Sequence, residues 1–140
     1  MPGDATVIAR VNSVQNTHAF AKAGLMMRKD LTAGSMHVFV DASPGTTVMK
    51  LEKRATAGAT TTATDDAPSA ANRWLRLVRV GTTFSASWSN DGVSWTSPTG
   101  WTNQAMTGLS GTLYVGLAVT SHNDGMLCTS SMDSISITTP

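Results

Sequence analysis

Four tryptophans are the residues of this chain whose type and spacing point most directly to chemistry. Trp74, Trp88, Trp95 and Trp101 fall within 28 positions, although aromatic residues make up only 6% of the chain. Flat aromatic faces suit sugar rings, because the C–H groups of the sugar pack on the π face while its hydroxyls stay free for hydrogen bonds. We therefore expect part of this set to form a stacking surface.

The four rings are not equivalent. Trp88 shares a strand face with Phe84 and Ala86, which predicts a position in the core. Trp95 follows a tight turn, and Trp101 lies in a loop without apolar neighbours. Exposed loop tryptophans are typical of binding sites. Trp95 and Trp101 are therefore the candidate platforms, with packing at the edge of the core as the alternative.

Charged side chains on strand-like segments form a second candidate group. They are Arg10, Lys22, Arg28, His37, Glu52, Arg54 and Arg76. Each shares a strand face with few large apolar residues, which is typical of the solvated face of a half-buried sheet. The alternative is a concave polar face on which Arg and His bind the hydroxyls or carboxylates of a saccharide. On that interpretation the polar contacts are Arg28, His37, Arg76 and His122.

Catalytic and metal-binding motifs are weak in this chain. Glycoside cleavage normally uses two carboxylates, but Glu52 is the single glutamate, and Asp41, Asp91 and Asp124 adjoin turn residues. No Gly-x-Ser-x-Gly elbow occurs, and the three histidines share no metal-ligand spacing. We predict no catalytic residue, no cofactor and no metal ligand set, with Ca²⁺ bound by Asp and Asn oxygens of the loops as an alternative.

Composition favours a β-rich domain. Serine and threonine fill 36 of 140 positions, whereas charged residues make up 14%. Thr and Val suit pleated strands and Gly and Ser suit turns, while a helical bundle would need more Glu and Lys. The net charge of +1 argues against a nucleic-acid partner, and no apolar stretch reaches the roughly 20 residues of a membrane span. Cys128 is the single cysteine, so no disulfide within the chain is expected.

Short strand-like runs separated by turn residues predict an all-β, two-sheet antiparallel sandwich. The runs are Thr6–Asn12, Phe20–Arg28, Ser35–Asp41, Thr47–Arg54, Trp74–Val80, Thr83–Ser89, Tyr114–Ser121 and Cys128–Thr138. Residues 41–45 and 122–125 are expected to be turns. Residues 55–72 are low in complexity and predict a surface connection, with at most a weak edge strand at 59–64.

One turn has a recognisable pattern. The segment Ser89–Trp95 reads Ser-Asn-Asp-Gly-Val-Ser-Trp and resembles the sialidase Asp box, with one residue fewer between Asp and Gly. Asn and Asp before Gly tolerate positive φ, so this segment is expected to stabilise a hairpin rather than to catalyse.

Five segments, in order, resemble a known domain family. They are Ala21–Arg28, Leu31–His37, Trp74–Arg79, Ser89–Thr96 and Tyr114–His122. Together they resemble the concanavalin A-like domains of the DUF1349 type, which are appended to large secreted bacterial proteins, often glycoside hydrolases or adhesin-like chains. The resemblance covers residues 4–138. It implies a jelly-roll sandwich with an accessory, carbohydrate-binding role and with no established catalytic residues.

The chain departs from this family in two ways. Family domains carry further strands before Gly3–Thr6, so residues 1–140 are expected to form a single domain that lacks its first strands. An uncovered sheet edge promotes association, which predicts a homodimer. The stretch 97–111, which contains Trp101, is longer than in the family.

The residues and the resemblance together predict a non-catalytic carbohydrate-binding module whose partner is a polysaccharide. We expect it to be secreted as part of a larger bacterial protein, although this chain shows no signal region. Two alternatives stay open. One is a structural or self-association domain of an extracellular protein; the other is a small glycoside hydrolase or lyase that depends on Asp residues or Glu52.

Overall fold

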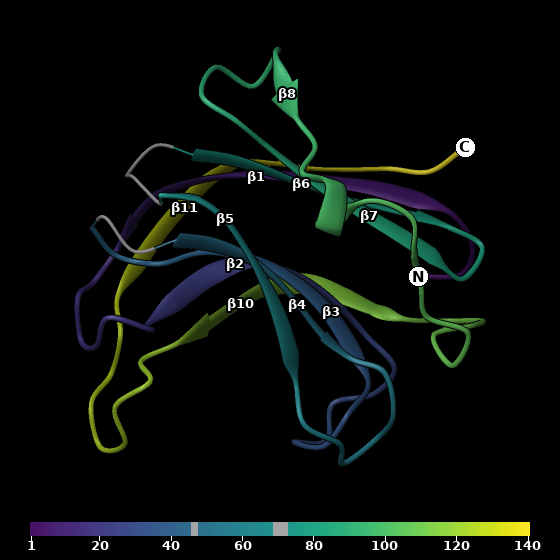
Figure 1. Ribbon diagram of the computed structural model, residues 1–140, viewed down its shortest axis with the longest axis horizontal. Coiled ribbons are helices and arrows are strands. Elements are labelled where there is room, and N and C mark those ends of the chain that lie inside the picture. Colours follow the sequence, from purple (N-terminus) through teal and green to yellow (C-terminus); the bar gives the residue numbers. More distant parts are fainter. Residues whose placement is uncertain (46–47, 69–72) are drawn as a thin grey trace.

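Two antiparallel sheets packed face to face make up the computed structural model, which describes residues 1–45, 48–68 and 73–140 (Figure 1). The strands are β1 (Ala5–Val14), β2 (Lys22–Arg28), β3 (His37–Ala42), β4 (Val48–Arg54), β5 (Thr62–Pro68), β6 (Arg73–Val80), β7 (Thr83–Ser89), β8 (Trp95–Thr96), β9 (Gln104–Ala105), β10 (Tyr114–Thr120) and β11 (Ser130–Thr138). A 3-10 helix, η1 (Thr99–Trp101), precedes β9. The expected all-β, two-sheet antiparallel jelly-roll sandwich is confirmed. No helix in the described ranges is long and apolar enough to cross a membrane.

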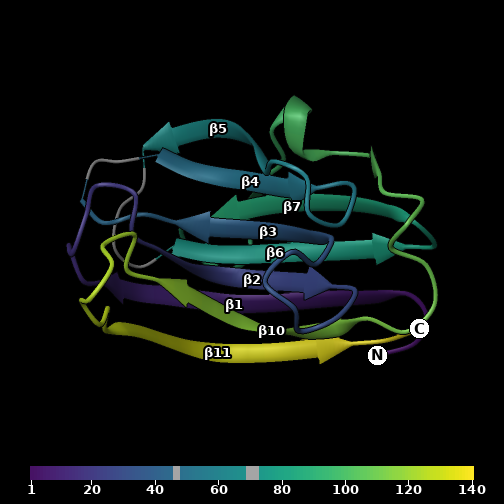
Figure 2. The same ribbon diagram turned by 90° about the horizontal axis from the view of Figure 1, so that it is seen from below.

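The chain passes repeatedly from one sheet to the other. Sheet A has the strand order β11-β1-β6-β7-β8, and β9 also pairs with β7. Sheet B has the order β10-β2-β3-β4-β5 and lies in front of sheet A in Figure 2. Strand β1 pairs with β6 on one side and with β11 on the other, so that Thr6 lies opposite Thr138. The chain changes sheet after β1, after β5, after β9 and after β10, whereas β2 to β5 and β6 to β9 each stay within one sheet.

The core lies between the sheets, because apolar side chains occupy alternate positions of the central strands. On β2, Ala23, Leu25 and Met27 are fully buried. Phe84 and Ala86 on β7 are buried as predicted. The other strands contribute Val7, Ala9, Val11, Val38, Val40, Leu51, Leu75 and Leu77, and Trp88 packs partly buried against this cluster. Most of the side chains between them, which face outward, are polar.

The segment 97–111 contributes three side chains to the core, although most of its other residues are exposed. Trp101 is fully buried in the core, and its Nε1–H donates a hydrogen bond to the carbonyl oxygen of Thr64 at 2.9 Å. Met106 and Leu109 of the same segment are also buried. The expectation that Trp101 is a stacking platform is therefore wrong. Trp101 belongs to the core cluster, together with Met106 and Leu109 of the same segment and apolar residues of the strands.

Two further local predictions change with the observed strands. The edge strand expected at 59–64 is β5, at Thr62–Pro68, which pairs with β4 at the edge of sheet B. Residues 69–72 of the expected connection, and Thr47 at the start of the next expected run, lie outside the described residues. The sequence places Asp41 in a turn, whereas it lies within β3 opposite Gly24 and is fully buried.

Asp91 holds the hairpin turn between β7 and β8. Its carboxylate accepts hydrogen bonds from the backbone N–H groups of Ser94 at 2.7 Å and Val93 at 2.8 Å, and these bonds lower the pKa of Asp91 to about 2. Gly92 adopts a φ of +76° directly against the ring of Trp74. The prediction of a hairpin-stabilising turn is confirmed.

Candidate functional site

The outer face of sheet B carries the main group of polar side chains. The strands of this sheet curve, and their concave side is turned away from sheet A (Figure 1). Cross-strand partners share a face, and the register places Tyr114, Arg28, His37 and Arg54 in one row across β10, β2, β3 and β4. Because Met27, next to Arg28, is buried in the core, this row points outward.

An open groove of about 470 Å³ lies over this face. Its lining includes Met26, Arg28, His37, Phe39, Glu52 and Arg54. A second hollow, of about 240 Å³, adjoins the groove and shares Met26, Arg28 and Ala118 with it. The groove therefore combines charged groups with an apolar floor made by Met26 and Phe39.

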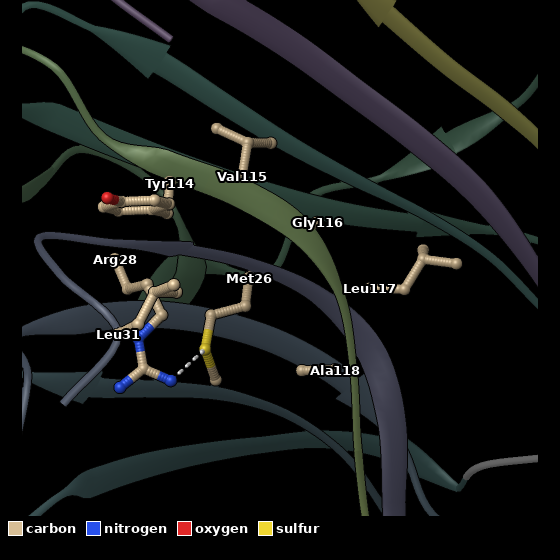
Figure 3. A pocket seen from close by; sticks show the side chains of 8 residues that line it. All are labelled: Met26, Arg28, Leu31, Tyr114, Val115, Gly116, Leu117 and Ala118. Carbon is tan, nitrogen blue, oxygen red and sulfur yellow. Dashed lines mark hydrogen bonds between the residues drawn. The ribbon is translucent and has the colours of Figure 1, made fainter. Parts of the chain in front are cut away.

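Figure 3 shows the adjoining hollow. The side chains of Tyr114, Leu31, Arg28 and Met26 gather on one side of β10, whereas Leu117 lies on the other side. The Tyr114 side chain is 53% exposed. An exposed aromatic ring thus stands beside the guanidinium group of Arg28.

Backbone carbonyl groups hold both guanidinium groups of the row in place. Arg28 donates from Nε to the carbonyl oxygen of Asp30 at 2.7 Å and from Nη2 to that of Thr32. Arg54 donates from Nη1 to the carbonyl oxygen of Ala33 at 2.7 Å. The loop after β2 therefore fixes arginines from two different strands.

His37 lies between the two arginines, paired with Arg28 on one side and with Arg54 on the other. Its ring is buried, and Nδ1 lies 3.2 Å from the carbonyl oxygen of Ser35. Burial lowers the pKa of His37, and the positive charges of Arg54 and Arg28 lower it further, although the hydrogen bond to Ser35 acts in the opposite direction. The neutral ring therefore carries its proton on Nδ1, because a carbonyl oxygen can only accept. Its Nε2 can accept a hydrogen bond from a ligand.

Lysines and carboxyl groups occupy the other end of the face. Lys22 Nζ lies 3.6 Å from Glu52 Oε1, and Lys50 Nζ lies 3.0 Å from Asp65 Oδ1. Asp41, opposite Lys50, is buried, and neither of its carboxyl oxygens has a hydrogen-bond partner among the described residues. Burial first, and the charge of Glu52 second, raise the pKa of Asp41 well above its ordinary value. The protonated form of Asp41 is therefore favoured.

Within the described ranges, no three His, Cys, Asp or Glu side chains gather closely enough to hold a metal ion. His122 instead belongs to an aromatic cluster formed by two loops. The rings of His18 and His122 stack with their centroids 4.6 Å apart, and Phe20 lies 5.6 Å from each of them. Lys50 Nζ lies 5.3 Å from the centroid of Phe20, which connects this cluster to the lysine end of the sheet B face.

Arg76 and Trp95 form a separate pair on the outer face of sheet A. The Arg76 guanidinium lies 4.4 Å from the centroid of the Trp95 ring, and Arg76 Nε donates to Ser87 Oγ at 2.8 Å. The predicted contact residues are thus not brought together: two lie in the groove, two on the outer face of sheet A, one in the loop cluster and one in the core. Arg28 and His37 come together in the groove, while Arg76 and Trp95 do not join them.

Tyr114 was not among the residues singled out from the sequence, and Arg54 was not among the chosen contacts. Alternation along a strand indicates that both point to an outer face. Their position beside Arg28 and His37 depends on strand register, which the alternation of one strand does not specify on its own.

The side of the sandwich bounded by β10 and β11 is open. Leu117 pairs with the core residue Leu25, and Ile137 pairs with the core residue Val7, so both side chains face the interior. They are nevertheless 43% and 54% exposed. The interior of the sandwich therefore reaches the surface along this side.

Comparisons with known proteins establish the fold. No family model and no curated protein matches this chain, so the DUF1349 resemblance stays a prediction. A functionally unknown protein from Saccharomyces cerevisiae has a similar structure, with a TM-score of 0.71 and 18% identity over 100% of this chain and 71% of that chain. The GH43 protein BlXynB from Bacillus licheniformis is similar over 96% of this chain and 27% of its own length, with a TM-score of 0.74 and 11% identity. A mutant of BlXynB gives a TM-score of 0.75 at 12% identity. The chain is therefore similar in fold to a part of a much longer protein.

Proposed function

We propose that this chain is a non-catalytic carbohydrate-binding module that binds a polysaccharide along the outer face of sheet B. The observation that carries the proposal is the open groove of about 470 Å³, in which charged side chains surround the apolar Met26 and Phe39. A sugar presents hydroxyl groups and apolar C–H faces together, so this mixture of groups suits it.

The groove and the adjoining hollow together offer a partner to each kind of sugar group. The exposed ring of Tyr114 can stack on a sugar ring, and Nε2 of His37 can accept a hydrogen bond from a hydroxyl. Arg28 and Arg54 can donate to ring and hydroxyl oxygens. Because these side chains come from four neighbouring strands, a ligand would lie across the sheet.

The placement of the carboxyl groups favours binding over hydrolysis. A glycosidase needs two carboxyl groups that reach the scissile bond. Asp41 is fully buried beneath the face, which leaves Glu52 as the one carboxylate lining the groove in the part of the chain that the structure describes. Glu52 is also paired with Lys22.

The fold likeness to a GH43 protein supports a carbohydrate-related role. This chain corresponds to 27% of the length of BlXynB, as an accessory domain of a larger protein would. We propose the same setting here: a module appended to a larger secreted protein, which it tethers to a polysaccharide.

Calorimetry and affinity electrophoresis against a panel of polysaccharides test this proposal. Loss of a stacking platform should cost about 1–3 kcal/mol, by analogy with base–aromatic stacking, so Tyr114→Ala should weaken binding about five- to a hundredfold. Val93→Ala, an exposed apolar position in the turn of sheet A, is the matched control and should change nothing. Absence of binding to every polymer would overturn the proposal. So would a loss of binding caused by Trp95→Ala but not by Tyr114→Ala, because that result assigns the site to sheet A.

The open side of the sandwich favours a second function, self-association. Strand β10 contains no charged residue and β11 contains only Asp133, whereas exposed edge strands usually carry charges or proline that prevent pairing. The half-exposed Leu117 and Ile137 lie on these two strands. We propose that a second copy of this chain binds to this open side, because two uncharged edges do not repel each other when they pair.

Sedimentation velocity over a range of protein concentrations tests the self-association. The wild type should form dimers, and Leu117→Lys or Ile137→Lys should shift the population to monomers. A wild type that stays monomeric at all concentrations would rule this function out, whatever the outcome of the glycan panel.

A further inference from the structure

Among the described residues, the two arginines of the groove, Arg28 and Arg54, have no carboxylate partner. Within the described residues, the ion pairs of this face are made by Lys22 and Lys50. Arg28 and Arg54 instead donate to backbone carbonyl oxygens, which carry no net charge. Two positive charges therefore remain close to each other at one end of the groove.

The nearby carboxylate of Asp30 has other partners. It accepts hydrogen bonds from the backbone N–H of Thr32 at 2.9 Å and from Thr32 Oγ1. These bonds lower the pKa of Asp30, and the charge of Arg28 makes only a small contribution. Arg28 contacts the carbonyl oxygen of Asp30 and not its carboxylate. Its positive charge thus remains available to a ligand.

Each guanidinium group is fixed on one side and can donate on another. Arg28 Nη1 contacts the sulfur of Met26 at 3.8 Å, and sulfur is a weak acceptor. The hydrogen bonds of Arg54 use Nε and Nη1, so its Nη2 can donate to a ligand. Because the backbone already holds both side chains, binding an anion requires little further ordering.

Together with the proposed function, on which this inference rests, these contacts define the class of sugar. We infer that the groove binds an acidic polysaccharide, whose carboxylate or sulfate groups pair with Arg28 and Arg54. Arginine suits this role, because its planar guanidinium matches the oxygens of both groups.

Neighbouring side chains would complete the recognition of one acidic sugar unit. Tyr114 stands next to Arg28 in the row, so a ring stacked on Tyr114 places a charged substituent toward the arginines. His37 lies between Arg28 and Arg54 and can take up a proton on Nε2 when an anion binds. A neutral sugar would leave the two positive charges without a partner.

Calorimetry with two matched pairs of polymers tests the inference. Polygalacturonate is compared with its methyl ester, and dextran sulfate with dextran, so that the two pairs separate carboxylate from sulfate recognition. The acidic member of at least one pair should bind at least about tenfold more tightly, and added salt should weaken its binding. A charge-assisted hydrogen bond contributes enough that Arg28→Gln should weaken this binding about ten- to a hundredfold.

The variants include controls for charge and for folding. Arg73→Gln removes the same charge from β6 of sheet A and should leave binding unchanged. Arg54 also holds the loop at Ala33, so Arg54→Gln is accompanied by Arg54→Lys, with circular dichroism to verify the fold. The salt dependence of binding is measured on the wild type, so this part of the test does not depend on the folding of a variant.

The outcomes separate this inference from the proposed function. Equal affinity for the acidic and neutral members of both pairs would overturn the acidic class and leave carbohydrate binding in place. An acidic preference that persists in Arg28→Gln and Arg54→Gln would overturn the assignment of the site. Failure of every polymer to bind would overturn both proposals.

Discussion

Replacement of Trp101 by alanine should destabilise the fold more than the loss of any exposed aromatic ring. A buried tryptophan removes about 150–250 Å² from water. At about 25 cal/mol per Å², that area corresponds to about 4–6 kcal/mol. Trp101 is fully buried, so we expect Trp101→Ala to lower the free energy of unfolding by about 4 kcal/mol, within the range usual for such truncations.

Equilibrium unfolding in urea, followed by circular dichroism, measures this loss. Domains are stable by only about 5–15 kcal/mol, so a loss of about 4 kcal/mol is a large part of the total. Trp101→Phe therefore provides a milder second variant. It keeps most of the buried area but removes the donor to the Thr64 carbonyl, which should cost about 1–3 kcal/mol. Trp95→Ala is the control, because that ring is partly exposed on sheet A. A Trp101→Ala variant as stable as Trp95→Ala would refute the reasoning, because it would indicate that the Trp101 ring is exposed.

Three other substitutions probe separate features. Asp41→Asn should gain stability relative to the wild type as the pH rises above 3.8. The folded wild type holds the Asp41 proton more tightly than the unfolded chain does, so the stability of the wild type falls with rising pH by up to about 1.4 kcal/mol per pH unit. A difference between the two proteins that is constant with pH in urea unfolding would contradict the buried, protonated carboxyl. Gly24→Ala places a Cβ 2.0 Å from the Val40 carbonyl oxygen and should lower the free energy of unfolding by about 1–3 kcal/mol in the same assay. Gly116→Ala is the control: its Cβ meets no atom within 4 Å, so the free energy of unfolding should not change. Asp91→Ala should destabilise the protein at neutral pH, and the difference from the wild type should disappear as the pH falls from 3.8 through about 2. The pKa of Asp91 is lowered, so its carboxylate stabilises the fold only while it is ionised. Equal melting temperatures of the two proteins at neutral pH would argue against a stabilising turn.

The fold class could be predicted from the sequence because alternation is a local property. Ala23, Leu25 and Met27 on one side of β2, with Lys22 and Arg28 on the other, already indicate a strand with one buried face. The same pattern in most of the other runs predicts a sandwich. Strand β5 is only weakly indicated by the sequence, since its Thr, Ala and Asp residues lack the large side chains that make alternation visible.

The candidate site could be predicted only in part, because it depends on which sheet a strand joins. Arg28 and Arg76 look alike in sequence, each alternating with buried apolar residues. They lie on opposite faces of the molecule because β2 belongs to sheet B and β6 to sheet A. Trp101 shows the same limit in a loop: the residues next to it are polar or glycine, while most of the core cluster that it joins comes from the strands.

The pairing of β1 with β11 determines when this protein can complete its folding. Thr6 and Thr138 face each other across the two strands, so sheet A acquires its β11 edge only after nearly the whole domain has been synthesised. Bringing such distant segments together is slow, because the entropy of closing the loop is lost before the contacts form. Until then the side of β1 that pairs with β11 presents an unpaired edge to other nascent chains.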